Sequence, residues 1–212
     1  MSETAKRRVQ SQYDSVAAGY ERRWSRYVEA SVAGTVARLQ IRPGDRVLDI
    51  GCGTGLLLGR LLERQPLAQY AGVDLSVGML SEARRRLPSR VRLVAGDAEA
   101  IPFPAGVFDV VVSSSSFHYW PSPRSGLVEV HRVLRPNGVL VITDWCDDYL
   151  ACKLCDRVLR VLDPAHHRIY GRAECTRLLE GADYREASVE RYRISWLWGL
   201  MTAIARVPAS SG

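Results

Sequence analysis

The chain has 212 residues, of which 47% are hydrophobic and 25% are charged, and its formal net charge is +6. These proportions are typical of a folded domain and exclude intrinsic disorder, a collagen-like chain and a disulfide miniprotein. No apolar run is long enough to span a bilayer, and the first residues lack the apolar segment of a secretory signal. We therefore expect a cytoplasmic protein that does not insert into a membrane.

The positive charge is spread along the chain. Only two of the 29 basic residues are lysines, Lys6 and Lys153, and the rest are arginines. The densest basic run, 84–86 with Arg90 and Arg92, has the pattern of a solvated helix face. A nucleic-acid-binding protein is expected to cluster its basic residues with exposed aromatic ones, so we expect no nucleic-acid partner. A phosphate-bearing partner is the alternative.

Predicted helices and strands alternate through the first two thirds of the chain. Apolar positions at helical spacing predict a helix over 9–40, and a Pro-Gly-Asp turn at 43–45 precedes the first strand. The other predicted elements are strands over 46–50, 70–74, 90–95, 108–113 and 139–143, and helices over 56–64, 77–86 and 125–134, the last ended by Pro-Asn-Gly at 136–138. Strands that alternate with helices indicate βαβ units and a doubly wound parallel sheet.

The last third of the chain contains two helical patterns, 149–162 and 173–180, and then two strand patterns, 187–194 and 200–207. The two strands are joined by a short connection, which favours a hairpin that inserts one antiparallel strand into the sheet. The predicted fold class is therefore α/β: a doubly wound, Rossmann-like, seven-stranded sheet with a C-terminal antiparallel strand and helices on both faces.

A glycine-rich segment, Gly-Cys-Gly-Thr-Gly at 51–55, leaves a predicted strand and opens a helix. Glycines at such a place allow a sharp turn and let a ligand approach the backbone. Asp74 ends the next strand 23 residues after Gly51, close to the spacing of a ribose-binding acid. Gly55 comes one residue too early for the dinucleotide fingerprint, and the lysine of a P-loop is missing. The pattern predicts a site for a nucleoside without phosphates.

Five segments resemble, in a fixed order, the motifs of the class I S-adenosylmethionine (SAM)-dependent methyltransferases. They are Val-Leu-Asp-Ile-Gly-Cys-Gly-Thr-Gly at 47–55, Gly-Val-Asp-Leu-Ser at 72–76, Gly-Asp-Ala-Glu-Ala-Ile-Pro-Phe at 96–103, Phe-Asp-Val-Val-Val-Ser at 108–113 and Arg-Val-Leu-Arg-Pro-Asn-Gly-Val-Leu at 132–140. The resemblance extends from about Tyr13 to Thr143 and is strongest to the small-molecule methyltransferases of quinone-biosynthesis type. It implies SAM as cofactor, S-adenosylhomocysteine as product and a small-molecule acceptor.

The resemblance also implies which residues hold the cofactor's amino-acid end and ribose. Asp49 and the backbone at Gly51 and Gly53 would hold the methionine part, together with the carbonyl of Ser113. Asp74 would accept hydrogen bonds from both ribose hydroxyls. Taken alone, Asp74 has the alternative role of a helix N-cap.

The same resemblance implies which residues contact the nucleoside. Leu75 and Met79 would pack on the nucleoside. Asp97 would contact the adenine amino group and the Ala98 backbone the ring nitrogen, although Asp97 alone is equally consistent with a surface turn.

The resemblance divides the single domain, 1–212, into three parts. Residues 1–42 would form lid helices, in which Tyr13 and Tyr20 cover the cofactor. Residues 43–146 would form the SAM-binding core, and residues 147–212 would supply acceptor-site helices and the last two strands.

His118 follows the fourth predicted strand, where an open α/β sheet places its ligand. A phenol or an acidic carbon is a weak nucleophile and gains from a general base, so His118 is the candidate catalytic residue; a structural histidine is the alternative. The Asn/Asp-Pro-Pro-aromatic motif of many adenine and glutamine-amide N-methyltransferases does not follow strand four. The chain also has no Pro-Cys pair, which supplies the nucleophile for methylation of cytosine at C5. Acidic residues for a magnesium site after strand four are also missing.

Five cysteines are present, and an odd number without an export signal predicts reduced thiols. Cys152 and Cys155 have metal-ligand spacing, but they lie in a helical pattern, so we expect packing thiols and no metal. The same applies to Cys146 and Cys175.

Aromatic residues from distant segments are expected above the carboxyl edge of the sheet. They are Tyr13, Tyr20, Trp24, Phe117, Tyr119, Trp120, Trp196 and Trp198. An apolar, aromatic pocket predicts a planar or lipophilic acceptor, methylated at oxygen or carbon. Two alternatives stay open: a non-catalytic SAM-binding or interaction protein, and a nucleotide-dependent oxidoreductase, against which the early third glycine argues.

Overall fold

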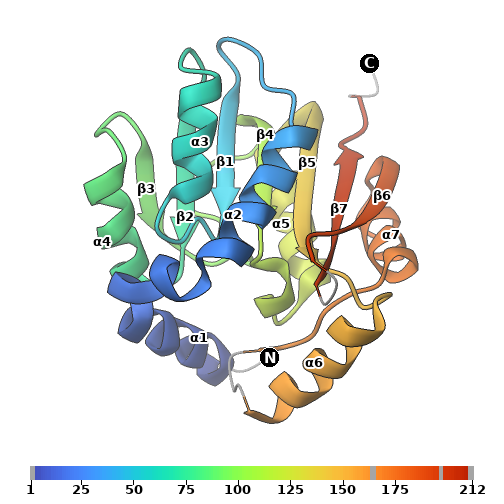
Figure 1. The fold of residues 1–212 in the computed structure, drawn as a ribbon. Helices are drawn as coiled ribbons and strands as arrows, with labels where there is room; N and C mark the ends of the chain where they lie inside the picture. Colours follow the sequence, from blue (N-terminus) through green and yellow to red (C-terminus); the bar gives the residue numbers. More distant parts are fainter. Residues whose placement is uncertain (1–2, 163–165, 196–197, 210–212) are drawn as a thin grey trace.

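The computed structural model describes residues 3–162, 166–195 and 198–209, without the side chains of residues 3–5, 18 and 20–26. Its centre is a seven-stranded sheet in the order β3-β2-β1-β4-β5-β7-β6 (Figure 1). β7 runs antiparallel to both of its neighbours, whereas β1 to β5 are parallel. The strands are β1 (Arg46–Ile50), β2 (Gln69–Asp74), β3 (Arg92–Ala95), β4 (Phe108–Ser114), β5 (Leu134–Trp145), β6 (Arg185–Arg193) and β7 (Gly199–Arg206). The predicted fold class, including the inserted antiparallel strand, is confirmed.

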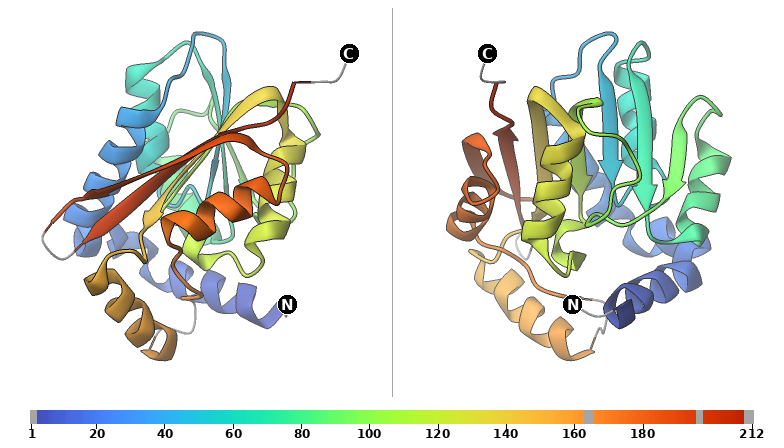
Figure 2. Two further views of the ribbon diagram at one scale, coloured as in Figure 1. Left: turned by 90° about the vertical axis from the view of Figure 1, so that its right-hand side faces the viewer. Right: turned by 180° about the vertical axis from the view of Figure 1, so that it is seen from behind.

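Helices cover both faces of the sheet because successive strand residues point to opposite sides. α2 (Tyr20–Arg38), α3 (Leu56–Arg64) and α4 (Val77–Arg86) bury their apolar residues with Val110 and Val112 of β4 on one face. α5 (Pro123–Val133) and α7 (Arg172–Glu180) pack with Val111 on the other face (Figure 2). A strand buried on both faces explains the unbroken valine run of β4.

Two helices lie beyond the carboxyl ends of the parallel strands, α1 (Glu3–Val16) and α6 (Leu150–Leu162) (Figure 1). The single helix predicted over 9–40 is wrong, because a 3₁₀ turn, η1 (Ala17–Gly19), separates α1 from α2. Gly19 is the N-cap of α2. The break turns α1 away from the face of the sheet and across its carboxyl edge.

The predicted end of α5 is also corrected. The helix stops at Val133, and β5 begins at once, so the Pro-Asn-Gly at 136–138 lies inside the bounds of the strand. Asn137 takes a left-handed φ of 62°. Its amide and the Gly138 carbonyl pair with the backbone of Val207 at 3.1 and 3.0 Å. This pairing partner lies 70 residues away, and a local turn pattern does not reveal it.

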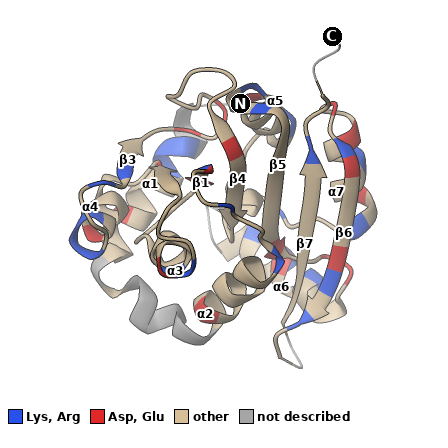
Figure 3. Cartoon of the chain, turned by 90° about the horizontal axis from the view of Figure 1, so that it is seen from above, with Lys and Arg blue, Asp and Glu red and all other residues tan. Residues whose placement is uncertain are grey.

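Charged residues lie at the outer edges of the molecule, on α4 at one side of the sheet and on β6 at the other (Figure 3). Within the described part of the chain, every helix is too short or too polar to cross a bilayer.

Candidate cofactor and acceptor site

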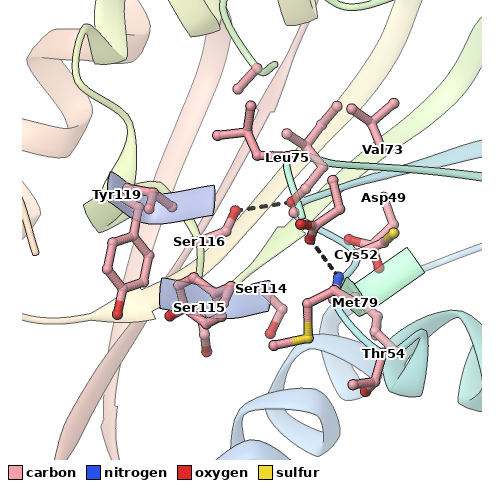
Figure 4. Close-up of a pocket in the computed structure, with 18 of the residues that line it drawn as sticks. Asp49, Cys52, Thr54, Val73, Leu75, Met79, Ser114, Ser115, Ser116 and Tyr119 are labelled. Carbon is pink, nitrogen blue, oxygen red and sulfur yellow. Dashed lines mark hydrogen bonds between the residues drawn. The ribbon is translucent and has the colours of Figure 1, made fainter. Parts of the chain in front are cut away.

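A pocket opens at the carboxyl ends of β1, β2 and β4 (Figure 4). Val9 and Tyr13 of α1 also line it. It encloses about 1020 Å³ of empty space, including solvent at its mouth. Nine of the eleven predicted cofactor residues line it: Tyr13, Asp49, Gly51, Gly53, Asp74, Leu75, Met79, Asp97 and Ala98. Ser113 is fully buried and lies beneath the wall, which Ser114 to Ser116 form instead. The side chain of Tyr20 lies outside the described residues.

The three glycines of the loop meet two different demands. Gly51 approaches Ser116 so closely that a Cβ would lie 2.4 Å from the serine Cβ, and a Cβ on Gly55 would lie 2.7 Å from Leu87. Gly53 differs: its φ is +53°, and a Cβ there would meet no protein atom within 4 Å. Two glycines therefore serve packing, and Gly53 leaves backbone open to the pocket.

Asp74 ties the loop to the start of α4. Its Oδ2 accepts a hydrogen bond from the Gly53 amide at 2.8 Å, and its Oδ1 accepts one from the Ser76 amide at 2.8 Å. Burial raises the pKa of Asp74, against the opposing effect of these two donors. The carboxylate is thus held at the end of β2, in the position predicted for a ribose partner.

Asp49 is the least satisfied polar group in the pocket wall. It is 1% exposed, and within the described chain its Oδ1 has no hydrogen-bond partner. Burial, helped by the nearby Asp74 carboxylate, raises the pKa of Asp49 to about 8. A buried carboxyl group that lacks a partner is suited to a cationic ligand, because an ammonium group supplies both the missing donor and the missing charge.

We predict that Asp49→Asn stabilises the ligand-free protein at alkaline pH. A carboxyl whose pKa rises from its usual 3.8 to about 8 on folding favours the folded state at low pH and loses that advantage as the pH rises toward 8. The stability gained by the variant should therefore grow between pH 5 and pH 8, by about 4 kcal/mol if the whole shift is expressed. Denaturant unfolding of wild type and variant at both pH values measures their free energies of unfolding. A difference between the two proteins that is the same at pH 5 and pH 8 would contradict the prediction.

α1 covers the pocket and is fastened at both of its ends. The Lys6 ammonium pairs with the Asp97 carboxylate and, at 2.9 Å, with Glu99. Near the other end, Asp14 Oδ1 accepts hydrogen bonds from the Ser76 hydroxyl at 2.6 Å and the Gly78 amide at 2.9 Å. Asp97, predicted to contact adenine, therefore also holds the lid through its ion pair.

The serine-rich end of β4 forms a wall that sequence reasoning missed. Ser115 has a left-handed φ of 58°, and its Oγ accepts a hydrogen bond from the Tyr27 hydroxyl at 2.7 Å. Ser31 of α2 bonds to Ser114 at 3.0 Å and to Ser115 at 2.8 Å. The repeated serines were the available signal, but their partners on α2 lie more than 80 residues away in the chain.

His118 lies in η2 (Phe117–Tyr119), just after β4, and is 4% exposed. Its Nδ1 lies 2.7 Å from Asp144 Oδ1, and its backbone amide donates to Asp144 Oδ2 at 2.9 Å. An ionised carboxylate only accepts, so Nδ1 carries the hydrogen and Nε2 is the basic nitrogen. His118 does not line the cofactor pocket itself; the adjoining Tyr119 does, with ring centroids 4.0 Å apart.

Aromatic rings enclose His118. Trp145 stacks against it at 5.5 Å, and the His166 ring lies 5.5 Å away. His166 Nε2 pairs at 2.8 Å with Asp156, which α6 supplies. This second carboxylate–histidine pair was not predicted, because its members lie ten residues apart around the end of a helix.

Some of the aromatic residues that were predicted to meet above the carboxyl edge of the sheet do so. Tyr13 and Tyr119 meet edge to face at 5.4 Å, and Trp120 also lines the pocket. Phe117 is fully buried core. Trp198 packs on Trp145 at 5.0 Å. The side chain of Trp24 and all of Trp196 lie outside the described residues.

The cysteines are free thiols, four of them buried and Cys155 half-buried. Burial raises the pKa of Cys146 and Cys175 to about 12, which keeps both protonated at neutral pH. Within the described residues, His, Cys, Asp and Glu side chains form no group of three or more arranged to hold a metal ion.

A Rossmann-like sheet with an inserted antiparallel strand and a nucleoside-sized pocket at its glycine loop defines a class I methyltransferase fold. Comparison with known proteins agrees. A methyltransferase-domain family model matches residues 48–142. A SAM-dependent methyltransferase from Mesorhizobium loti has a similar solved structure, with a TM-score of 0.70 and 22% identity, covering 84% of this chain and 97% of that one.

Two curated relatives are similar over the core. A demethylmenaquinone methyltransferase of Thermus thermophilus is 41% identical over 103 residues, which is 47% of each chain. A malonyl-[acyl-carrier protein] O-methyltransferase of Geobacter sulfurreducens is 36% identical over 152 residues, 68% of this chain and 57% of the relative. The chain thus spans about half the length of these curated relatives.

Residues 48–142 match a methyltransferase domain, and the chain resembles the class I SAM-dependent methyltransferases of the quinone-biosynthesis type. SAM is accordingly its cofactor. The residues present fit that group: Asp49 offers an unpartnered buried oxygen to a cation, and Gly53 leaves the loop open to a ligand.

Proposed function

We propose that this chain transfers the methyl group of SAM to an oxygen or carbon atom of a small planar or lipophilic acceptor. The observation that carries the proposal is the buried His118–Asp144 pair beside the cofactor pocket. A histidine that is paired with a carboxylate and enclosed by aromatic rings can act as the general base for an acceptor with a weakly acidic O–H or C–H.

Each residue has a defined part in this reaction. Bound SAM supplies a methyl group that its sulfonium already activates. Asp49 holds the ammonium end of the cofactor, and Asp74 holds the ribose. Asp144 fixes the His118 tautomer, and His118 Nε2 takes up the proton that the acceptor loses on methylation. Tyr13 and the rest of α1 exclude water from the pocket.

Two observations support a planar or lipophilic acceptor. Tyr13, Tyr119 and Trp120 line the pocket, and the ring of Tyr119 also contacts that of His118. Aromatic rings stack well on a flat, apolar ligand. Demethylmenaquinone, named for the Thermus thermophilus relative, is an acceptor of this chemistry.

A metabolite-extract screen tests the proposed activity. The protein is incubated with a small-molecule extract and SAM labelled in its methyl group, and labelled products are identified by mass. We expect an apolar product labelled at oxygen or carbon. A labelled amine or nucleic acid would contradict the proposed acceptor, and a chain that binds SAM yet labels no acceptor would favour the non-catalytic alternative.

A further inference from the structure

α6 carries a row of apolar side chains that face solvent. Five of the eight large hydrophobic residues that are exposed in the described chain lie on this one helix, and they are between 47% and 83% exposed. They are Leu150, Leu154, Val158, Val161 and Leu162. Steps of three and four residues place all five along one side of the helix. A helix of 13 residues makes this row about 20 Å long.

The opposite side of α6 is fastened to the protein. Cys152 and Asp156 are buried, and Leu159 packs with Trp145 and neighbouring residues. Asp156 Oδ1 accepts a hydrogen bond from the Ile169 amide at 3.0 Å and pairs with His166. The helix is therefore docked by one side, and the exposed row is not a part of the core.

The exposed surface around the row is basic. Lys153, Arg157 and Arg160 are exposed, whereas the one acidic residue of α6, Asp156, is buried and paired with Arg160 at 2.6 Å. Lys153 has a loose ion pair at 3.8 Å with Asp147, which precedes the helix. α1 lies at the same end of the molecule, where Arg7 and Arg8 are exposed (Figure 1).

We propose that α6 is an interfacial helix that docks this protein on a membrane surface that contains anionic lipids. The exposed apolar row of the helix faces the membrane. Apolar side chains flanked by basic ones match the acyl region and the charged headgroups of such a surface. A second copy of the chain fits less well, because pairing two α6 helices brings their basic residues together.

The docking would orient the acceptor site. Asp156 of α6 holds His166, whose ring lies 5.5 Å from that of His118. A helix lying on the membrane therefore places the aromatic enclosure next to the bilayer, from which a lipophilic molecule can enter. This proposal goes beyond the proposed function and does not require it, because membrane docking is measured without acceptor.

Vesicle sedimentation tests the docking. Wild-type protein should bind vesicles of equal parts phosphatidylglycerol and phosphatidylcholine at least about tenfold more tightly than vesicles of phosphatidylcholine alone, with binding weakened by salt. Leu154→Glu/Val161→Glu should reduce binding to the anionic vesicles by tenfold or more. Leu67→Glu/Val128→Glu is the matched control: it makes the same charge change at two exposed apolar residues away from α6 and should bind as wild type.

Several outcomes would overturn the proposal. Wild-type protein that does not bind anionic vesicles would contradict it. An equal loss of vesicle binding in the two double variants would also contradict it. If the protein does not bind vesicles but forms a dimer that Leu154→Glu/Val161→Glu dissociates, the row is an interface with a second copy. If it does not bind vesicles but binds an acidic protein through the row, the row is an interface with a protein partner. Both double variants should keep wild-type SAM affinity. Vesicle binding by a chain that methylates nothing would leave this proposal standing and contradict only the proposed function.

Discussion

Replacing Gly53 by valine should abolish SAM binding while leaving the fold in place. The φ of Gly53 is +53°, and no protein atom within 4 Å would meet a Cβ at this position. The new side chain would instead occupy the pocket, in the space that the ligand needs. We expect a dissociation constant raised by more than about 150-fold, because a direct clash should exceed the roughly 1.5–3 kcal/mol expected for the Asp74 hydrogen bonds removed in Asp74→Ala.

Gly106→Val is the control for backbone strain. Gly106 also has a left-handed φ, +66°, and open space around its Cβ, but it lies before β4, away from the pocket. Both variants carry a strain cost of about 1–2 kcal/mol, whereas only Gly53→Val should lose the cofactor. Calorimetric titration with SAM measures the difference. Binding within tenfold of wild type in Gly53→Val would show that the ligand does not lie on this loop.

The sheet and its order of elements are predictable because each strand carries a local signal. The valine run of β4 is typical of a strand buried on both faces, and the observed β4, Phe108–Ser114, differs from the prediction by one residue. The division between α1 and α2 was not predictable in this way. Ala17 to Gly19 contain no proline and no capping side chain, and the apolar spacing continues across them, so Gly19, the N-cap of α2, was the one weak local signal of the break.

The same distinction applies to the site. Asp49 and Asp74 were found because a motif fixes their distance from the glycine loop. Asp144 was not recognised as the partner of His118, because the two are 26 residues apart and meet only where β4 and β5 end side by side. Lys6 was likewise not recognised as a partner of Asp97, which lies 91 residues away in the sequence. Partners that the sheet brings together leave no local pattern.

His118→Ala should lower turnover on the identified acceptor by about 10²–10⁴-fold, the usual loss when a general base is removed. SAM affinity should stay near that of wild type, because His118 does not line the cofactor pocket. The rate constant and the dissociation constant thus separate a loss of chemistry from a loss of binding. His131→Ala, on α5 and packed against Tyr184 at 5.4 Å, changes a histidine remote from the site and should retain activity.

His118→Asn decides between a base and a structural histidine. The alanine variant leaves Asp144, which is 1% exposed, without its 2.7 Å partner, and this alone destabilises the site. An asparagine amide can donate to Asp144 from nearly the position of Nδ1, but it offers no basic nitrogen. If His118 is the base, the asparagine variant should fold and bind SAM as wild type yet remain about as inactive as the alanine variant. Recovery of wild-type turnover by His118→Asn would show that the histidine serves only to hold Asp144.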